Sequence, residues 1–507
     1  MESSEDQIAY TELTSGYASV AALRDAKQYL SWDQQVVMPA EGTPARRDQL
    51  AALSAQAHAE LTNTQIQEAL DQLSSVDLES SQNAVVREVA RQYDRAASVP
   101  TELVKEMAAT EAEALSAWER AREDDDFDIF APYLQSLLDL KREYANHIDS
   151  SRDIYGILFE EFEPYLGLER ADEILQAIRE ALVPLLSAIR ESSAELQTDA
   201  LSQGAPYSAA IQEELSQDVL ETLGMPPHRT RLDTATHPFS IGTPYDARIT
   251  TRFDETAPLS GLLSTIHEFG HATYTLGLPE ENQGSPLGEH RGLTVHESQS
   301  RLWENHVGRS PTFWEALTPI IQSRFSGVEE VTPTAAYEAV NQVYPDNLIR
   351  VEADELSYHL HIIIRYEIER DLLTGDLDVR EVPAVWNDRY QEYLGVQPQT
   401  DSEGCLQDIH WSRGNFGYFP TYSLGSALAA QIFSAAKTSI DSLEESIRCR
   451  EYDVLREWLQ TNIHQHGCRY TTETLIEQAT GESFTPEPFI QYLESKYGAL
   501  YDLPAYP

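Results

Sequence analysis

The sequence has little lysine, little cysteine and no long apolar run. Only five of its 36 basic residues are lysine, and 84 acidic residues give it a net charge of −48. Such a charge argues against proteins that bind nucleic acid or an anionic membrane. Three cysteines are too few for a disulfide scaffold, and no run approaches the roughly 18 apolar residues of a membrane span. The first residues show no signal segment, so we expect a cytoplasmic protein.

The acidic residues are spread along the whole chain and not gathered in one tail. Dispersed acid with little lysine indicates adaptation to very high salt, where charge repulsion is screened within a few ångströms. We therefore expect a halophilic protein. The 41% hydrophobic share still supports a sizeable core, which argues against disorder.

The segment His267-Glu268-Phe269-Gly270-His271 contains the H-E-x-x-H pattern of zinc peptidases. Residues four apart share one face of a helix, so both imidazoles can reach one metal ion. Glu268 lies roughly 100° round the helix, where a general base for an activated water would lie. The alternative is a chance match, but Pro258 suits a first helical turn and Gly277 with Pro279 would end the helix.

A catalytic zinc needs a third protein ligand. We predict Glu297, which begins the next helical pattern, because two histidines and a glutamate are a common hydrolytic set. His296 and His290 are the competing candidates. The alternative role for Glu297 is an acid favoured by the dipole at a helix N-terminus.

Most of the remaining chain has helical periodicity, including residues 174–189 and 348–372. Residues 237–253 instead predict a β-hairpin that leads directly into the metal helix. Arg248 and Arg252 share one strand face there and are candidates for substrate binding, with an ion pair to Asp246 or Asp254 as the alternative. We expect a mainly α protein with a small sheet.

Several further motifs occur in one order along the chain. They are Trp32-Asp33-Gln34 with Met38-Pro39, His237-Pro238-Phe239, Asp246-Ala247-Arg248-Ile249-Thr250, His296-Glu297-Ser298-Gln299, Ile349-Arg350-Val351-Glu352-Ala353-Asp354, Gly404-Cys405-Leu406-Gln407-Asp408-Ile409-His410-Trp411 and Phe416-Gly417-Tyr418-Phe419-Pro420-Thr421-Tyr422. With the His-Glu-Phe-Gly-His segment, they resemble the carboxypeptidase Taq family of metallocarboxypeptidases. One departure is Ser426, where that family usually has asparagine.

The resemblance implies a large helical peptidase with a deep active-site groove, a small sheet beside the metal helix, and a homodimer. We expect one domain over residues 1–507, in which residues 1–200 form one groove wall and residues 201–507 carry the metal site. The implied activity is removal of single C-terminal residues from peptides with broad specificity. Zinc is the expected metal and cobalt is also possible. A zinc-activated water would attack, with Glu268 as general base.

A carboxypeptidase must also bind a free carboxylate, which an arginine fork does well. The family motif suggests Arg350 for this role, with an Arg350–Asp354 helix pair as the alternative. His237 could donate to the developing oxyanion or be a structural histidine. Tyr422 could bind the carboxylate or the oxyanion, or simply pack.

Two other functions compete with this interpretation. The His-Glu-Phe-Gly-His segment also occurs in the thimet oligopeptidase family, which cuts internal bonds of short peptides. A non-catalytic acidic protein with a structural metal is the other, but such a site has no need of Glu268.

We predict that the protein needs molar salt, because at low ionic strength the repulsion among its acidic residues loosens the fold. Thermal unfolding, followed by circular dichroism, should show a clearly higher midpoint in near-saturated KCl than in dilute buffer. Equal midpoints in the two solutions would contradict the halophilic interpretation.

Overall fold

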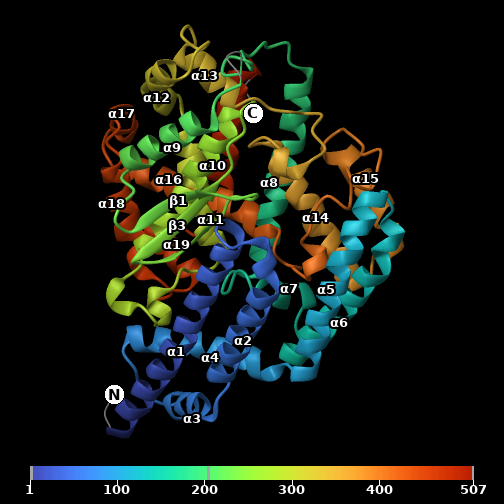
Figure 1. Cartoon of the computed structure of the whole chain (residues 1–507), viewed down its shortest axis with the longest axis vertical. Helices are drawn as coiled ribbons and strands as arrows, with labels where there is room; N and C mark the ends of the chain where they lie inside the picture. Colours follow the sequence, from blue (N-terminus) through green and yellow to red (C-terminus); the bar gives the residue numbers. More distant parts are fainter. Residues whose placement is uncertain (1–3, 203–205, 505–507) are drawn as a thin grey trace.

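The computed structural model describes residues 4–202 and 206–504, and helices dominate it (Figure 1). One three-stranded sheet accompanies them, so the predicted mainly α fold with a small sheet is confirmed. Among the described residues, no helix is long and apolar enough to cross a bilayer.

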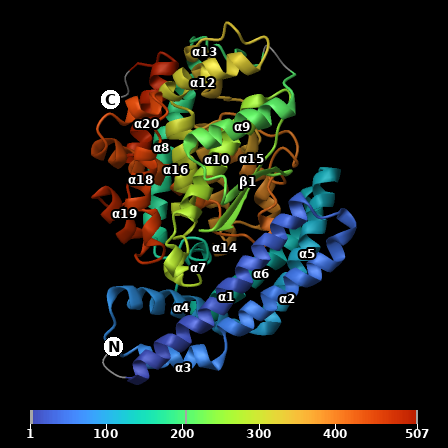
Figure 2. The ribbon, with the colours of Figure 1, turned by 60° about the vertical axis from the view of Figure 1, so that its left-hand side comes forward.

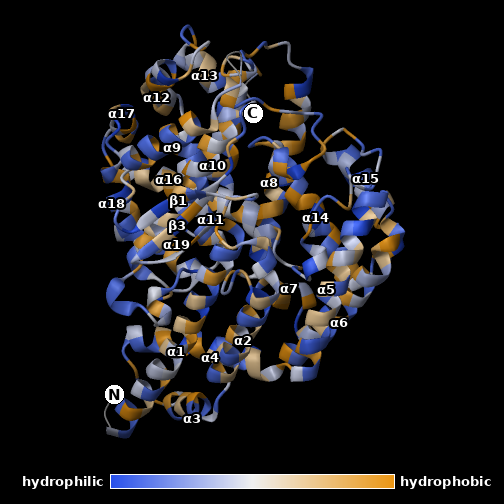
Figure 3. Ribbon diagram, in the orientation of Figure 1, coloured by the Kyte–Doolittle hydropathy of each residue, from blue (hydrophilic) through white to orange (hydrophobic). Residues whose placement is uncertain are grey.

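The first part of the chain is a succession of helices joined by short turns. They are α1 (Ser4–Val36), α2 (Thr43–Leu61), α3 (Thr64–Leu73), α4 (Ser80–Ser98), α5 (Thr101–Asp124), α6 (Ala131–Asp149), α7 (Ile154–Phe159) and α8 (Leu168–Glu191). In α8 the apolar residues at helical spacing from Ile174 to Ile189 are all buried, as their pattern predicts. Figure 3 shows hydrophobic and hydrophilic residues interleaved along these helices.

Helices α1–α4 have a small hydrophobic core of their own, built on residues such as Leu13, Tyr17, Ile66 and Val89. They lie in the lower part of the molecule in both views (Figures 1 and 2). Helices α5–α8 contribute instead to the main core, which continues to the C-terminal helices. Burial of apolar area at about 25 cal/mol per Å² stabilises both clusters.

The second part begins with α9 (Ala209–Leu223), β1 (Thr230–Thr234), β2 (Ser240–Thr243), β3 (Asp246–Thr251), α10 (Pro258–Leu276) and α11 (Leu293–Arg301). A π-helical turn, Leu302–Gly308, continues α11. Then follow α12 (Pro311–Arg324), α13 (Pro333–Val340), α14 (Ser357–Thr374), α15 (Val382–Tyr393), α16 (Pro420–Ser439), α17 (Leu443–Arg448), α18 (Asp453–Asn462), α19 (Thr472–Thr480) and α20 (Glu487–Leu500).

The sheet has the order β1-β3-β2 and packs beside α10. Strands β2 and β3 are antiparallel neighbours, so the predicted hairpin is confirmed. Strand β1 pairs parallel with β3 and was not predicted, because Thr-Arg-Leu-Asp-Thr lacks an apolar run and is only half buried. Tyr29 of α1 donates to the Asp246 carbonyl at 2.7 Å and ties the hairpin to the N-terminal helices.

The helix predicted over residues 348–372 begins later, at Ser357. Asp354 accepts hydrogen bonds from the backbone N–H groups of Leu356 and Ser357, both at 2.9 Å, and this caps the start of α14. Arg350 lies before the cap in a 3₁₀ turn, Arg350–Glu352. The alternative Arg350–Asp354 helix pair is therefore wrong, because the two residues are not on one α-helix.

Glu369 of α14 connects three parts of the chain. Its carboxylate accepts hydrogen bonds from Tyr155 Oη at 2.8 Å, Trp411 Nε1 at 2.9 Å and the Gly417 backbone N–H at 3.2 Å. Burial raises the pKa of Glu369 to about 7, against the lowering effect of these donors. The group holds the loops that carry the motifs around Trp411 and Gly417.

We predict that Glu369→Gln changes how stability depends on pH. The pKa of Glu369 is raised in the folded state. The contribution of the protonated carboxyl to the free energy of unfolding is therefore fully present below about pH 4.5 and is lost as pH rises through about 7. Between pH 5 and 8 the free energy of unfolding of the native protein, relative to the variant, should fall by about 2–3 kcal/mol. Urea unfolding measures this difference. The exposed Glu392→Gln is the control, and a difference independent of pH would contradict the prediction.

Candidate metal centre

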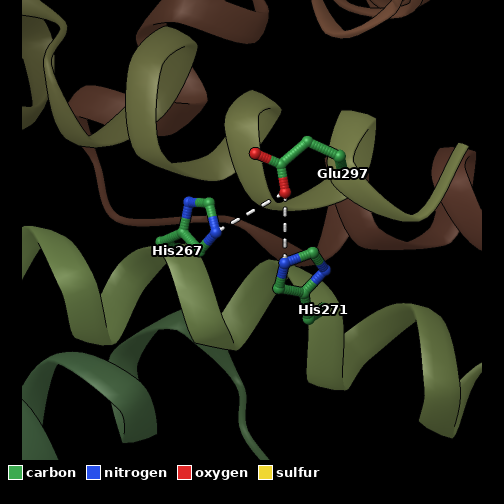
Figure 4. Close-up of side chains that lie close together, drawn as sticks. All are labelled: His267, His271 and Glu297. Carbon is green, nitrogen blue, oxygen red and sulfur yellow. Dashed lines mark ion pairs between the residues drawn. The ribbon is translucent and has the colours of Figure 1, made fainter. Parts of the chain in front are cut away.

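Helices α10 and α11 bring together the three predicted metal ligands. Nε2 of His267 lies 3.7 Å and Nε2 of His271 lies 3.4 Å from Oε2 of Glu297 (Figure 4). The three ligand atoms lie within 4.8 Å of one another, so these side chains could hold one metal ion.

The two competing histidines lie behind this group. Nδ1 of His296 is hydrogen-bonded to Nδ1 of His271 at 2.6 Å, with the two rings tilted by 33°, and His290 packs against His296. Glu297 is the side chain that faces both Nε2 atoms. A His₂Glu donor set fits a hydrolytic zinc site.

Two glycines allow the helices to approach closely enough for this geometry. A Cβ on Gly270 of α10 would lie 2.4 Å from the Gln299 carbonyl oxygen of α11. A Cβ on Gly425 of α16 would lie 2.5 Å from Cγ of Glu297. Helix α11 is therefore enclosed between α10 and α16, and the glutamate is pressed towards the histidines.

Glu304 orients His267 from the other side. Its Oε2 lies 2.9 Å from His267 Nδ1, which leaves Nε2 free to bind a metal. Arg301 and Arg309 hold this carboxylate at 3.0 and 3.2 Å. Burial raises the pKa of Glu304, but Arg301 and His267 outweigh it and hold that pKa well below its usual range.

Arg301 also holds the ligand Glu297, donating from Nε to Oε1 at 2.8 Å. Here too burial raises the pKa of Glu297, while Arg301 and His267 outweigh it and keep the carboxyl ionised. Neither Arg301 nor Glu304 was predicted from the sequence. Their signal was present, because Glu297, Arg301 and Glu304 have the spacing of one helix face.

Glu268 has the environment of a proton acceptor. It is buried, and burial raises its pKa above the ordinary value. Its Oε2 accepts no hydrogen bond from any residue that the structure describes. A buried carboxylate oxygen without a donor, next to two imidazoles, fits a site that takes up a metal and a reacting water.

His267 and Glu268 line a cavity of about 630 Å³, which agrees with the predicted groove. Arg301, Arg350 and Tyr358 contribute to the same wall. This volume lies in the range of small-molecule and peptide sites.

Arg350 lines this cavity and forms an ion pair with Asp408, which also binds Arg365. Its Nε and one terminal nitrogen donate to Oδ1 of Asp408 at 2.9 and 2.6 Å. Arg365 donates to the other oxygen of Asp408 at 2.5 Å. One carboxylate thus serves two guanidinium groups, which leaves one positive charge in excess. Asp408 and Arg365 were not predicted, although Asp408 belongs to one of the motifs.

Tyr422 lies near Arg350, with the guanidinium carbon 5.6 Å from its ring centre and its hydroxyl 3.4 Å from His410 Nε2. Burial lowers the pKa of His410 to about 4, so this histidine is neutral near pH 7. The departure at Ser426 leaves α16 intact, and its hydroxyl donates to the Tyr422 carbonyl at 3.3 Å.

The two other candidates, His237 and Arg248, are not among the residues that line this cavity. His237 is exposed, and its neighbour Pro238 forms the nearby cavity wall. Arg248 pairs with Asp246 at 2.7 Å and stacks over Trp32, as the ion-pair alternative predicts. Their roles in substrate binding stay predictions that this geometry does not favour.

A family model described as carboxypeptidase Taq (M32) metallopeptidase matches residues 12–497. Thermostable carboxypeptidase 1 of Thermus thermophilus is 38% identical over 509 residues, which covers 98% of this chain and 99% of the relative. Carboxypeptidase 1 of Bacillus subtilis is 34% identical and covers 94% of this chain and 95% of its own length.

Two solved structures of carboxypeptidases are similar to this chain over nearly its whole length. The M32 carboxypeptidase from Deinococcus radiodurans has a TM-score of 0.94 at 36% identity, covering 98% of this chain and 100% of its own. A structure titled Pyrococcus furiosus carboxypeptidase Apo-Mg has a TM-score of 0.94 at 32% identity, covering 98% and 99%.

We predict that Glu304→Gln weakens metal binding by about 10 to 100-fold, because His267 loses the carboxylate that orients it. Titration against a competing chelator, with metal counted by mass spectrometry, measures the change. The exposed Glu315→Gln should bind metal normally. A native affinity in a folded Glu304→Gln protein would contradict this role.

Proposed function

Because this chain belongs to the carboxypeptidase Taq (M32) family of metallopeptidases, we propose that it releases single amino acids from the C-termini of peptides. The resemblance found in the sequence is confirmed, and the protein is a metallocarboxypeptidase. The observation that carries the finer proposal is Arg350, which shares one cavity with His267 and Glu268.

In this proposal His267, His271 and Glu297 hold the metal. We propose zinc, with cobalt as the alternative, because nitrogen and carboxylate ligands of this kind suit zinc. When bound, such an ion polarises the scissile carbonyl and lowers the pKa of a water. Arg301 keeps the ligand Glu297 ionised, and Glu304 orients the imidazole of His267.

Glu268 moves the proton. Its buried position and raised pKa make it a stronger base than an exposed glutamate, and its free oxygen can accept the proton of the attacking water. The same carboxyl can then deliver that proton to the leaving amine. We propose that the Tyr422 hydroxyl, which lies 3.4 Å from Nε2 of neutral His410, donates a hydrogen bond near the substrate's end.

Arg350 would bind the free carboxylate of the peptide. After pairing with Asp408, which Arg365 shares, the group retains one positive charge for a second carboxylate. Tyr358 Oη lies 3.4 Å from Arg350 and lines the same wall. This arrangement favours cleavage at a chain end over cleavage of internal bonds.

Some expectations rest on the resemblance alone. These are broad specificity and the homodimer, and we keep both, together with the expected cytoplasmic location, as proposals. Peptides are the substrate class that the family implies.

We predict that blocking the terminal carboxylate as an amide lowers kcat/KM on the order of 100-fold, because Arg350 loses its partner. Mass analysis of one peptide over time should show stepwise loss of single residues from the C-terminus.

The variant Glu268→Gln should keep its metal and lose about 100 to 10,000-fold in kcat.

The exposed Glu281→Gln, prepared in parallel, should behave as the native enzyme. Equal cleavage of the free and the amidated peptide at internal bonds would instead support an oligopeptidase. Full activity of a metal-loaded Glu268→Gln protein would remove the proposed proton transfer.

A further inference from the structure

A second cavity, of about 660 Å³, lies between the N-terminal helices α1, α2 and α4 and the loop that leads into α11. Its wall contains a group of basic side chains that we call the basic cluster: Arg24, Lys27, Arg91, Arg95 and Arg291. Three carboxylates line the same cavity: Glu88, Glu161 and Glu289. In a chain with 84 acidic and 36 basic residues, this is a local reversal of charge.

Arg95 is paired with Glu161 at 3.3 Å and approaches Glu160 at 3.9 Å, but the ion pairs inside the cavity do not neutralise the other members of the basic cluster. Glu88 accepts from Arg291 at 2.7 Å and from Arg87 at 2.8 Å, and Arg91 approaches it at 3.6 Å. One buried carboxylate therefore serves three guanidinium groups. The Nε atoms of Arg91 and Arg291 are buried and have no hydrogen-bond acceptor within the described residues.

Arg24 and Lys27 of α1 are the more accessible members of the cluster. Arg24 donates to the Gln92 side-chain oxygen at 2.7 Å, which is a neutral partner. Neither residue has a carboxylate within 4.0 Å among residues 4–202 and 206–504. Their charge is thus available to an anionic group that enters the cavity.

The two cavities adjoin opposite ends of the metal helix. The cavity with Arg350 is lined by Pro258 and Leu263 from the first half of α10, and by His267 and Glu268 at the middle of the helix. The second cavity is lined by His290 and Arg291, and the Arg291 backbone N–H donates to the hydroxyl of Tyr274, in the second half of α10, at 2.9 Å. The metal ligands lie between these two ends.

This order matters for a bound peptide. If Arg350 takes the C-terminal carboxylate, the residues before the cleaved bond extend past His271 and His296. His290 packs on His296 with ring centres 4.5 Å apart and lines the second cavity. Figures 1 and 2 both place α1, α2 and α4 below α10.

We propose that the basic cluster binds aspartate and glutamate side chains of the peptide, upstream of the residue that is released. The enzyme thus selects peptides with an acidic segment before their C-terminus. This inference rests on the proposed carboxypeptidase activity and specifies its substrate class.

The test uses octapeptides that are acetylated at the N-terminus and share one C-terminal residue with a free carboxylate. A pair of glutamates, or of glutamines or lysines, is moved one position at a time along the upstream part, at one fixed salt concentration. Glutamate at the matching positions should raise kcat/KM about tenfold over glutamine, and lysine should lower it. Equal rates for the three series would overturn the proposal.

The variant Arg24→Gln/Lys27→Gln should reduce the glutamate-to-glutamine ratio to near one. A control with the same change in net charge is Arg120→Gln/Arg380→Gln, in which both residues are exposed and outside the cavity. This control should keep the full ratio. An equal loss of the ratio in both variants would show a general charge effect and would overturn the site.

Binding separates this proposal from the proposed reaction. Fluorescent versions of the same peptides are titrated into metal-loaded Glu268→Gln protein, and their Kd values are compared. An acidic peptide that binds about tenfold more tightly than its glutamine counterpart supports the basic cluster even if no residue is released. Stepwise release with no preference in binding or rate would leave the carboxypeptidase intact and overturn the cluster.

Discussion

Three donor atoms from two helices must meet at one point, and much of the structure serves this constraint. The histidines lie one turn apart on α10, and Glu297 approaches from α11. Backbones without side chains at Gly270 and Gly425 allow this distance. The helix then widens into a π-turn at Leu302–Gly308, which carries Glu304 back towards His267. π-helical turns of this kind often occur at functional sites. One half-buried arginine, Arg301, joins the ligand Glu297 and the supporting carboxylate of Glu304.

At each cavity, one carboxylate serves more than one arginine. Asp408 serves Arg350 and Arg365, and Glu88 serves Arg87, Arg91 and Arg291. A buried guanidinium without any partner would be very costly, and a fully paired one would have little attraction for a ligand. A shared carboxylate offsets part of the cost of desolvating the guanidinium groups and leaves a net positive charge. Arginine suits this arrangement because its planar fork offers several donors at once.

The sequence predicted those features that depend on local spacing. The H-E-x-x-H helix, the β2–β3 hairpin and the helical character of α8 follow from periodicity and turn residues. Features that depend on distant partners were missed. Strand β1 is a strand because it pairs with β3, and Arg350 is held by Asp408, 58 positions further along. The start of α14 was placed too early, because Asp354 was interpreted as a member of the helix when it caps it. Glu304 lies at helical spacing from Glu297 in the sequence, but only the fold shows that it faces His267.

The acidic residues spread along the chain have a consequence for the rate at which substrate arrives. A peptide diffuses through the field of a body with a net charge of −48 before it meets either cavity. An anionic peptide is repelled over about 10 Å at 0.1 M salt and over only about 3 Å at 1 M. Salt therefore acts twice and in opposite directions on such a substrate, since it speeds the encounter at the surface and weakens the attraction inside. For a dilute acidic peptide, kcat/KM would be lowered by slower encounter in dilute buffer and by weaker binding in concentrated salt.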